Sequence, residues 1–133
     1  MPEAALRRAL GRVCLAFGLA HLLPVAFVWL SSGGPAPVMV AARTWSLFFY
    51  AHFIALVVGG FGLQAWSASR TKLFYGGPLI DFAIGVTGFM IVETITGLAL
   101  RHGAAGPSWP ALLPGVLLAA FGIRLGTGRP LLG

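Results

Sequence analysis

Residues 78–100 carry the sequence PLIDFAIGVTGFMIVETITGLAL, which is almost wholly apolar but contains two acids, Asp81 and Glu93. Its length matches the roughly 20 residues that an α-helix needs to cross the hydrocarbon core of a bilayer. Because an ionised carboxylate is costly in hydrocarbon, acids in such a helix usually face a partner, a cavity or the interior of a bundle. We therefore expect a membrane-spanning helix whose two acids are the first candidates for function.

Three further apolar segments flank this one, at about residues 13–30, 44–66 and 109–125. Breaks rich in Gly, Pro, Ser and basic residues separate all four segments. The whole chain of 133 residues is 58% hydrophobic and 9% charged, and its mean hydropathy is +0.90. These values lie far from those of soluble domains. The sequence predicts a single domain over residues 1–133, an all-α integral membrane protein folded as a four-helix transmembrane bundle.

The basic residues predict the orientation of this bundle. With a cytoplasmic N-terminus, Arg43 and Arg101 fall on the outer side. Seven basic residues then fall on the inner side: Arg7, Arg8, Arg12, Arg70, Lys72, Arg124 and Arg129. This asymmetry follows the positive-inside rule, so we expect a multi-pass protein of a cytoplasmic-type inner membrane with both termini in the cytoplasm. The net charge of +6 does not indicate nucleic-acid binding, because the cations are scattered at segment ends.

An outer group of polar residues converges from three predicted helices. At 1.5 Å per residue, His21 falls near the middle of the bilayer, and His52, Glu93 and Tyr50 fall about 5, 6 and 7 Å outward of it. Glu93 and His52 are expected to form an acid/base pair that faces a cavity, with Tyr50 orienting a bound molecule. The open alternative is a neutral glutamic acid tied to a histidine that only orients the helices. The expected ligand-binding residues on the cavity wall are His21, Trp45 and Thr96.

A second polar group is predicted in the inner half of the bundle. By the same rise per residue, Asp81, Gln64 and Arg124 fall about 12, 13 and 10 Å inward of the middle of the bilayer. A carboxylate paired with an arginine and an amide is a common way to satisfy buried polarity. We expect a mainly structural polar cluster of these three residues.

The leading functional hypothesis is a small membrane-embedded enzyme. Buried acids and bases suit proton transfer, so the reaction would be an acid/base isomerisation or cyclisation of a lipophilic small molecule that enters from the bilayer. No cofactor is required for such a reaction. The single cysteine, Cys14, excludes an internal disulfide and a Cys-rich metal site, and no metal is expected.

Two other classes of function stay open. The first is an accessory subunit of a larger membrane complex, or a homo-oligomer, in which His21 and His52 could be axial ligands of a haem. The second is a proton or small-cation carrier that uses Glu93 and Asp81 as stations at different depths. Partners in every case would be the lipid bilayer and a small molecule or ion rather than nucleic acid.

Overall fold

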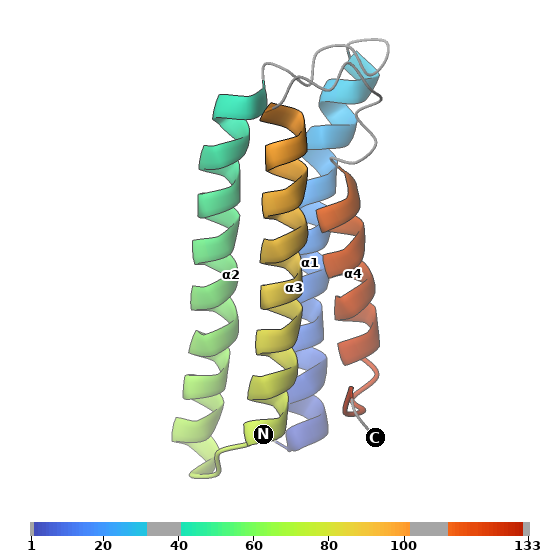
Figure 1. Ribbon diagram of the computed structural model, residues 1–133. Coiled ribbons are helices and arrows are strands. Elements are labelled where there is room, and N and C mark those ends of the chain that lie inside the picture. The colour runs from blue at the N-terminus through green and yellow to red at the C-terminus, as the bar shows by residue number, and fades with distance from the viewer. Residues whose placement is uncertain (1, 32–40, 102–111, 132–133) are drawn as a thin grey trace.

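The protein forms four α-helices in the computed structural model (Figure 1). The structure describes the backbone of residues 2–31, 41–101 and 112–131, and the side chains of residues 2–23, 51, 53–96, 98 and 112–131. The helices are α1 (Glu3–Ser31), α2 (Ala41–Thr71), α3 (Gly76–Arg101) and α4 (Leu113–Leu125). These described residues contain no β-strand. The prediction of an all-helical four-helix bundle is confirmed.

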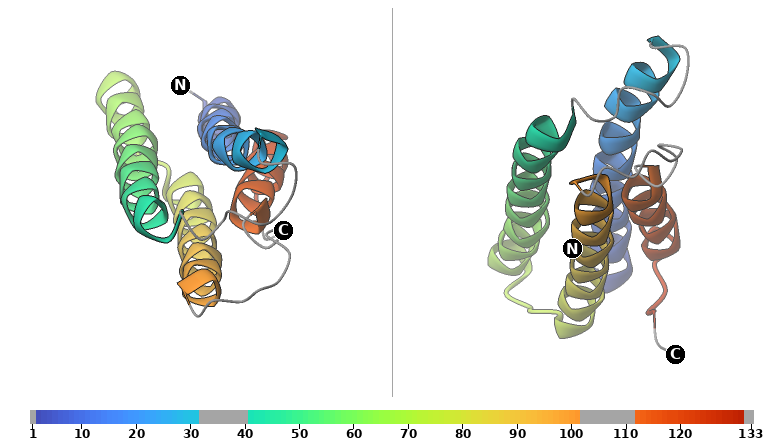
Figure 2. Two further views of the ribbon diagram at one scale, coloured as in Figure 1. Left: turned by 90° about the horizontal axis from the view of Figure 1, so that it is seen from above. Right: turned by 45° about the horizontal axis from the view of Figure 1, so that its top comes forward.

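Neighbouring helices in the chain run in opposite directions along the bundle. The N-terminus, the C-terminus and the connection between α2 and α3 therefore lie at one end, here termed the terminal end (Figure 1). In a view along the bundle, α1 lies beside α4, and α2 and α4 stand at opposite corners (Figure 2). Helices α1 and α3 are parallel, so residues early in α1 meet residues early in α3.

The helix ends follow from local sequence. Helix α1 begins at Glu3, well before the predicted apolar segment, because Glu3 and Arg7 pair across one turn with a distance of 2.9 Å between Oε1 and Nη2. Helix α4 begins at Leu113, with Pro114 in the first turn, where the missing backbone donor would have no intrahelical partner. The predicted fourth segment thus starts a few residues before the helix itself.

Helices α1 and α4 touch backbone to backbone. A Cβ atom added to Gly11 would lie 2.5 Å from the nitrogen of Gly126, and one added to Gly122 would lie 2.5 Å from the nitrogen of Leu15. At Gly18 the same atom would lie 2.6 Å from the nitrogen of Ala119. Only small residues permit this approach, which is typical of helix pairs that associate in membranes.

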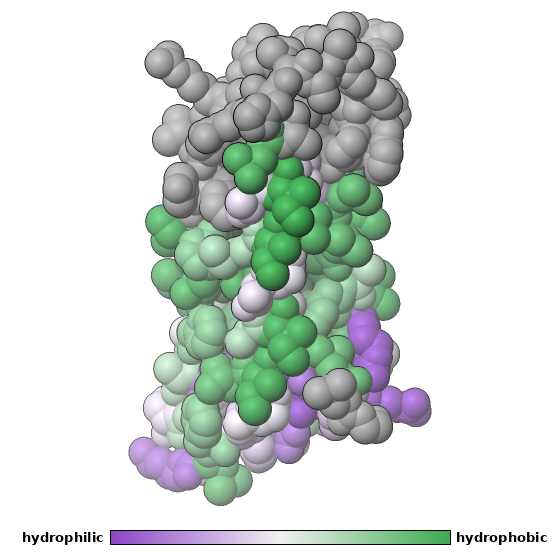
Figure 3. Space-filling model, in the orientation of Figure 1, coloured by the Kyte–Doolittle hydropathy of each residue, from purple (hydrophilic) through white to green (hydrophobic). Residues whose placement is uncertain are grey.

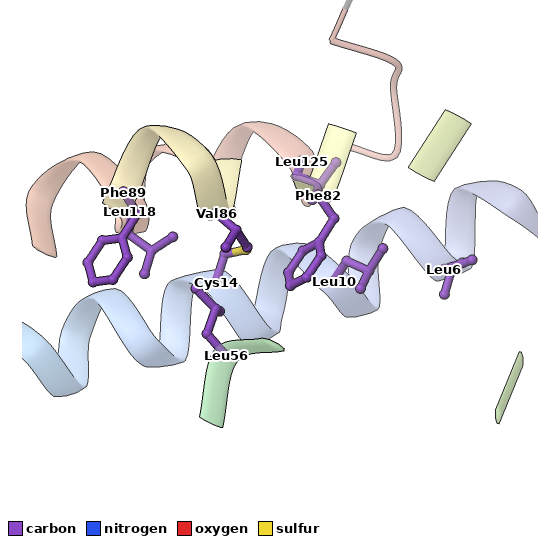
Figure 4. Packing of buried hydrophobic residues seen from close by; sticks show 9 residues of the cluster. All are labelled: Leu6, Leu10, Cys14, Leu56, Phe82, Val86, Phe89, Leu118 and Leu125. Atoms are coloured by element: carbon purple, nitrogen blue, oxygen red, sulfur yellow. The ribbon is translucent and has the colours of Figure 1, made fainter. Parts of the chain in front are cut away.

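Aromatic side chains fill glycine positions at two other helix contacts. The Phe82 ring of α3 occupies the space that a side chain at Gly60 of α2 would need, and the Phe121 ring of α4 does the same at Gly85 of α3. The hydrophobic core of the bundle is a cluster of apolar side chains from all four helices (Figure 4). Its buried members are Leu6, Leu10, Cys14, Leu56, Phe82, Val86, Phe89, Leu118 and Leu125.

Large apolar side chains also cover the outside of the bundle. Exposed examples occur on all four helices: Leu19, Leu23, Ile54, Val58, Ile80, Ile84, Ile91, Ile95, Val116, Leu117 and Ile123. The face seen in Figure 3 has a broad hydrophobic band, and hydrophilic residues gather toward the terminal end. Among the described residues, one helix, over Gly76–Thr96, is long and apolar enough to cross a membrane. About a third of its most apolar stretch, 33%, is buried inside the protein.

Candidate functional site

Two polar contacts connect the parallel helices α1 and α3. Arg7 meets Asp81 near the terminal end, and His21 meets Glu93 deeper in the bundle. The two contacts lie about 20 Å apart along the helices, at a rise of 1.5 Å per residue. Apolar residues of the core cluster fill the length between them (Figure 4). No described hydrogen bond or ion pair links the two contacts to each other.

The His21–Glu93 contact is fully enclosed by the protein. Nε2 of His21 lies 3.7 Å from Oε2 of Glu93, and the two side chains are 0% and 1% exposed. This distance is longer than a hydrogen bond but well within electrostatic reach. Two titratable groups are thus held against each other away from water.

Three helices position this pair. The Phe89 ring, one turn before Glu93 on α3, stands edge-on to the imidazole of His21 at a centroid distance of 5.9 Å. A Cβ atom added to Gly115 would lie 2.9 Å from Cδ2 of His21, so the backbone of α4 forms another wall. Thr96 follows Glu93 by three residues, and its buried side chain shares the same face of α3. Gly115 leaves room for the imidazole ring of His21 because it has no side chain.

The Glu93 carboxyl group is not held by hydrogen bonds from the described part of the chain, unlike the carboxylate of a typical structural ion pair. Neither Oε1 nor Oε2 accepts a hydrogen bond from any described residue. A buried carboxyl group without fixed donors is stable mainly in its protonated form or when it shares a proton with a neighbouring base. Its neighbour is the imidazole of His21, a group that can take that proton and return it. A proton could pass between the two groups once they approach from 3.7 Å to hydrogen-bond distance.

The structure describes the side chains of three of the six residues of the predicted outer site. Glu93, His21 and Thr96 lie together, and His21 is the direct neighbour of Glu93 rather than a residue of the cavity wall. The side chains of Trp45, Tyr50 and His52 lie outside those that the structure describes. The Glu93–His52 pair and a haem between His21 and His52 accordingly stay predictions.

The predicted inner cluster needs a correction. The cation beside Asp81 is Arg7, whose side chain is 3% exposed, and the backbone nitrogen of Leu131 also donates to Oδ2 of Asp81 at 3.4 Å. Arg124 makes other bonds: its exposed guanidinium donates to the hydroxyl of Thr127 at 3.1 Å and to the carbonyl of Pro130 at 2.9 Å. The expected Asp81–Arg124 pair is wrong because Arg124 binds the turn that follows its own helix.

Gln64, the third member of that predicted cluster, is buried on α2. Its amide makes no hydrogen bond with the described residues. The structure therefore supports its predicted burial but gives it no bond to Asp81.

Arg7 is the residue that sequence reasoning missed. The positive-inside pattern places Arg7 on the inner side with its neighbour Arg8 but does not predict its burial between Glu3 and Asp81. The sequence spacing could have indicated that Arg7 has a fixed partner. Glu3 and Arg7 are four residues apart, and an i,i+4 pair restrains the arginine on one face of the helix. The side chain of Arg7 also occupies the space beside Gly77, where a Cβ atom would lie 2.6 Å from Nη2.

The described residues hold no group of three or more His, Cys, Asp or Glu side chains that could bind a metal ion. No protein-family model, curated protein or solved structure matches the chain. The chemistry of the His21–Glu93 pair is consequently the main guide to function.

Proposed function

We propose that the chain is a multi-pass membrane protein whose terminal end faces the cytoplasm. The support is the set of large apolar side chains exposed on all four helices, since water-soluble monomers rarely expose large contiguous apolar patches. The cations at the terminal end supply the orientation through the positive-inside rule.

A cysteine at Ser69 tests the orientation. Ser69 is exposed near the end of α2, whereas the native Cys14 is fully buried, so background labelling should be low. In intact cells, Ser69→Cys should stay unlabelled by a membrane-impermeant maleimide and should react once the membrane is permeabilised. Thr127→Cys, exposed at the same end, should behave identically. Labelling of either cysteine in intact cells would overturn the orientation.

We further propose that the protein is an enzyme that moves a proton within a lipophilic small molecule, causing isomerisation or cyclisation. The observation that carries this proposal is the buried His21–Glu93 pair at 3.7 Å inside an apolar bundle. Low dielectric strengthens the action of a positioned acid or base on an apolar substrate, and no bulk water competes for the proton. The predicted outer residues His52, Tyr50 and Trp45 would complete the binding site.

The proposed isomerisation balances without an oxidant, a reductant or a cofactor. The carboxylate of Glu93 accepts a proton from an allylic carbon, and the electrons of the broken C–H bond form a new double bond as the old one shifts. The remote carbon takes the proton that His21 carries in the starting state, and Glu93 then passes its newly gained proton to His21. In a cyclisation, Glu93 would first protonate a double bond, and the pair would recover a proton after ring closure. Each turnover returns Glu93 and His21 to their starting states.

Deuterium uptake tests this chemistry without knowledge of the substrate. Purified protein is incubated in D₂O with a total lipid extract of its host membrane, and the lipids are analysed by mass spectrometry. The native protein should place solvent deuterium in one lipid species and its isomer. Glu93→Gln, which keeps the shape of the side chain, should reduce the rate by about 100-fold or more, the usual contribution of a general acid or base.

Asp81→Asn is the matched control, because it changes the other buried acid of α3. Deuterium uptake per folded molecule should persist in this variant. Equal uptake by Glu93→Gln and the native protein would reject the role of Glu93, and the absence of uptake by the native protein would reject the enzyme proposal.

Proton carriage is a second candidate, favoured by the two buried acids of α3 that each face a basic residue of α1. In this alternative a proton would pass between the levels of Asp81 and Glu93. Proteoliposomes with a pH gradient and an internal pH dye separate the two functions. A carrier would dissipate the gradient in the native protein but not in Glu93→Gln, whereas an isomerase would leave the gradient unchanged in both.

A further inference from the structure

The terminal end of the bundle has a strong excess of positive charge. Six of its basic side chains are exposed: Arg8, Arg12, Arg70, Lys72, Arg124 and Arg129. The described acids at this end are Glu3 and Asp81, and both are engaged by Arg7. The exposed cations are therefore not neutralised by those acids.

Three of these cations gather at the turn that follows α4. Arg124 is held there by its bonds to the hydroxyl of Thr127 and to the carbonyls of Arg129 and Pro130. Arg129 lies within the same turn, and Nη1 of Arg8 comes from α1 to 3.1 Å from the position of a Cβ atom at Gly128. This group is termed the arginine turn and consists of Arg8, Arg124 and Arg129.

The backbone of the turn contributes to this arrangement. Gly128 has φ of +78°, a conformation that glycine adopts at little cost, and its nitrogen donates to the carbonyl of Leu125 at 3.1 Å. The close packing of Gly11 against Gly126 keeps the turn beside α1. Arg8 of α1, Arg124 of α4 and Arg129 of the turn itself therefore belong to one region of the terminal end.

We propose that the arginine turn binds the phosphate of an anionic phospholipid headgroup in the cytoplasmic leaflet. The proposal rests on the membrane location proposed above but not on the enzyme reaction. The partner follows from two kinds of side chain on one helix, because the exposed apolar residues Ile123 and Val116 precede Arg124 on α4. A molecule that satisfies both kinds of side chain carries an anionic head and acyl chains. Arginine is suited to the head because its planar guanidinium binds phosphate oxygens in pairs.

Native mass spectrometry of the detergent-purified full chain tests this inference. The probes are phosphatidylglycerol and phosphatidylcholine with the same acyl chains. Phosphatidylglycerol should be retained selectively, and Arg8→Gln with Arg129→Gln should weaken its retention by about 30-fold, as expected for two basic residues near an anionic lipid. The matched control removes two charges elsewhere at the same end: Arg70→Gln with Lys72→Gln should change retention by about twofold at most.

Several outcomes would overturn the proposal. Equal loss in the two double variants would mean diffuse attraction without a site, and equal retention of the two lipids would mean no headgroup recognition. Displacement of the lipid by millimolar inorganic phosphate would point to a soluble phosphate ligand instead. If the first double variant does not fold, Arg129→Gln alone, at an exposed position, must still weaken retention. Glu93→Gln should retain phosphatidylglycerol normally, so failure of the enzyme proposal would leave this result intact.

Discussion

Replacing Arg7 by methionine should lower the free energy of unfolding by about 3–5 kcal/mol, the usual effect of removing one partner of a buried ion pair. Asp81 would then be left as a buried charge, since its side chain is only 8% exposed and its other described bond is the 3.4 Å contact from Leu131. Thermal or denaturant unfolding of the purified protein in detergent measures this change.

Arg8→Met is the matched control for Arg7→Met. Arg8 is the next residue along α1 but is exposed, so its loss should change the unfolding free energy by about 0.5 kcal/mol at most. The double variant Arg7→Met with Asp81→Leu should recover much of the lost stability, because an apolar pair removes the uncompensated charge. Equal destabilisation by Arg7→Met and Arg8→Met would show that the Arg7–Asp81 contact does not stabilise the bundle.

Adding one methyl group at Gly122 should also be costly. The new Cβ atom of Gly122→Ala would lie 2.5 Å from the nitrogen of Leu15 and 2.6 Å from the carbonyl oxygen of Gly11, so two helix backbones must separate. We expect a loss of about 1–3 kcal/mol in the free energy of unfolding, as for other overpacked contacts. The same unfolding measurement applies.

Gly62→Ala is the control for Gly122→Ala, since no described atom lies within 4 Å of a Cβ atom at Gly62. Alanine favours the helix over glycine, so this change should be neutral or should stabilise the protein by up to about 1 kcal/mol. The opposite signs expected for the same substitution make the comparison decisive. A neutral Gly122→Ala would mean that α1 and α4 are less closely packed than the structure has them.

Local sequence was sufficient to predict four helices and to select Asp81 and Glu93 as residues that need buried partners. The reason is that a long apolar run requires a helix and that a carboxylate inside it requires compensation, and neither statement depends on which helices are neighbours. The depth estimate was also useful, because the rise per residue sets the level of each residue along its helix. It placed His21 and Glu93 within about 6 Å of each other in depth, and the structure brings these two side chains into contact.

Only the tertiary structure decided which partners meet, because rotation of each helix and the choice of neighbours arise from packing. Gly85 and Gly88 are three residues apart on α3, yet Gly85 accepts the Phe121 ring while Gly88 faces outward with no described atom within 4 Å of its Cβ position. Asp81 likewise meets Arg7, because α1 and α3 run in parallel with their first turns together, whereas Arg124 binds the turn that follows α4. The depth of a residue follows from its position along one helix. A contact between two residues depends on how the side chains of two helices pack together.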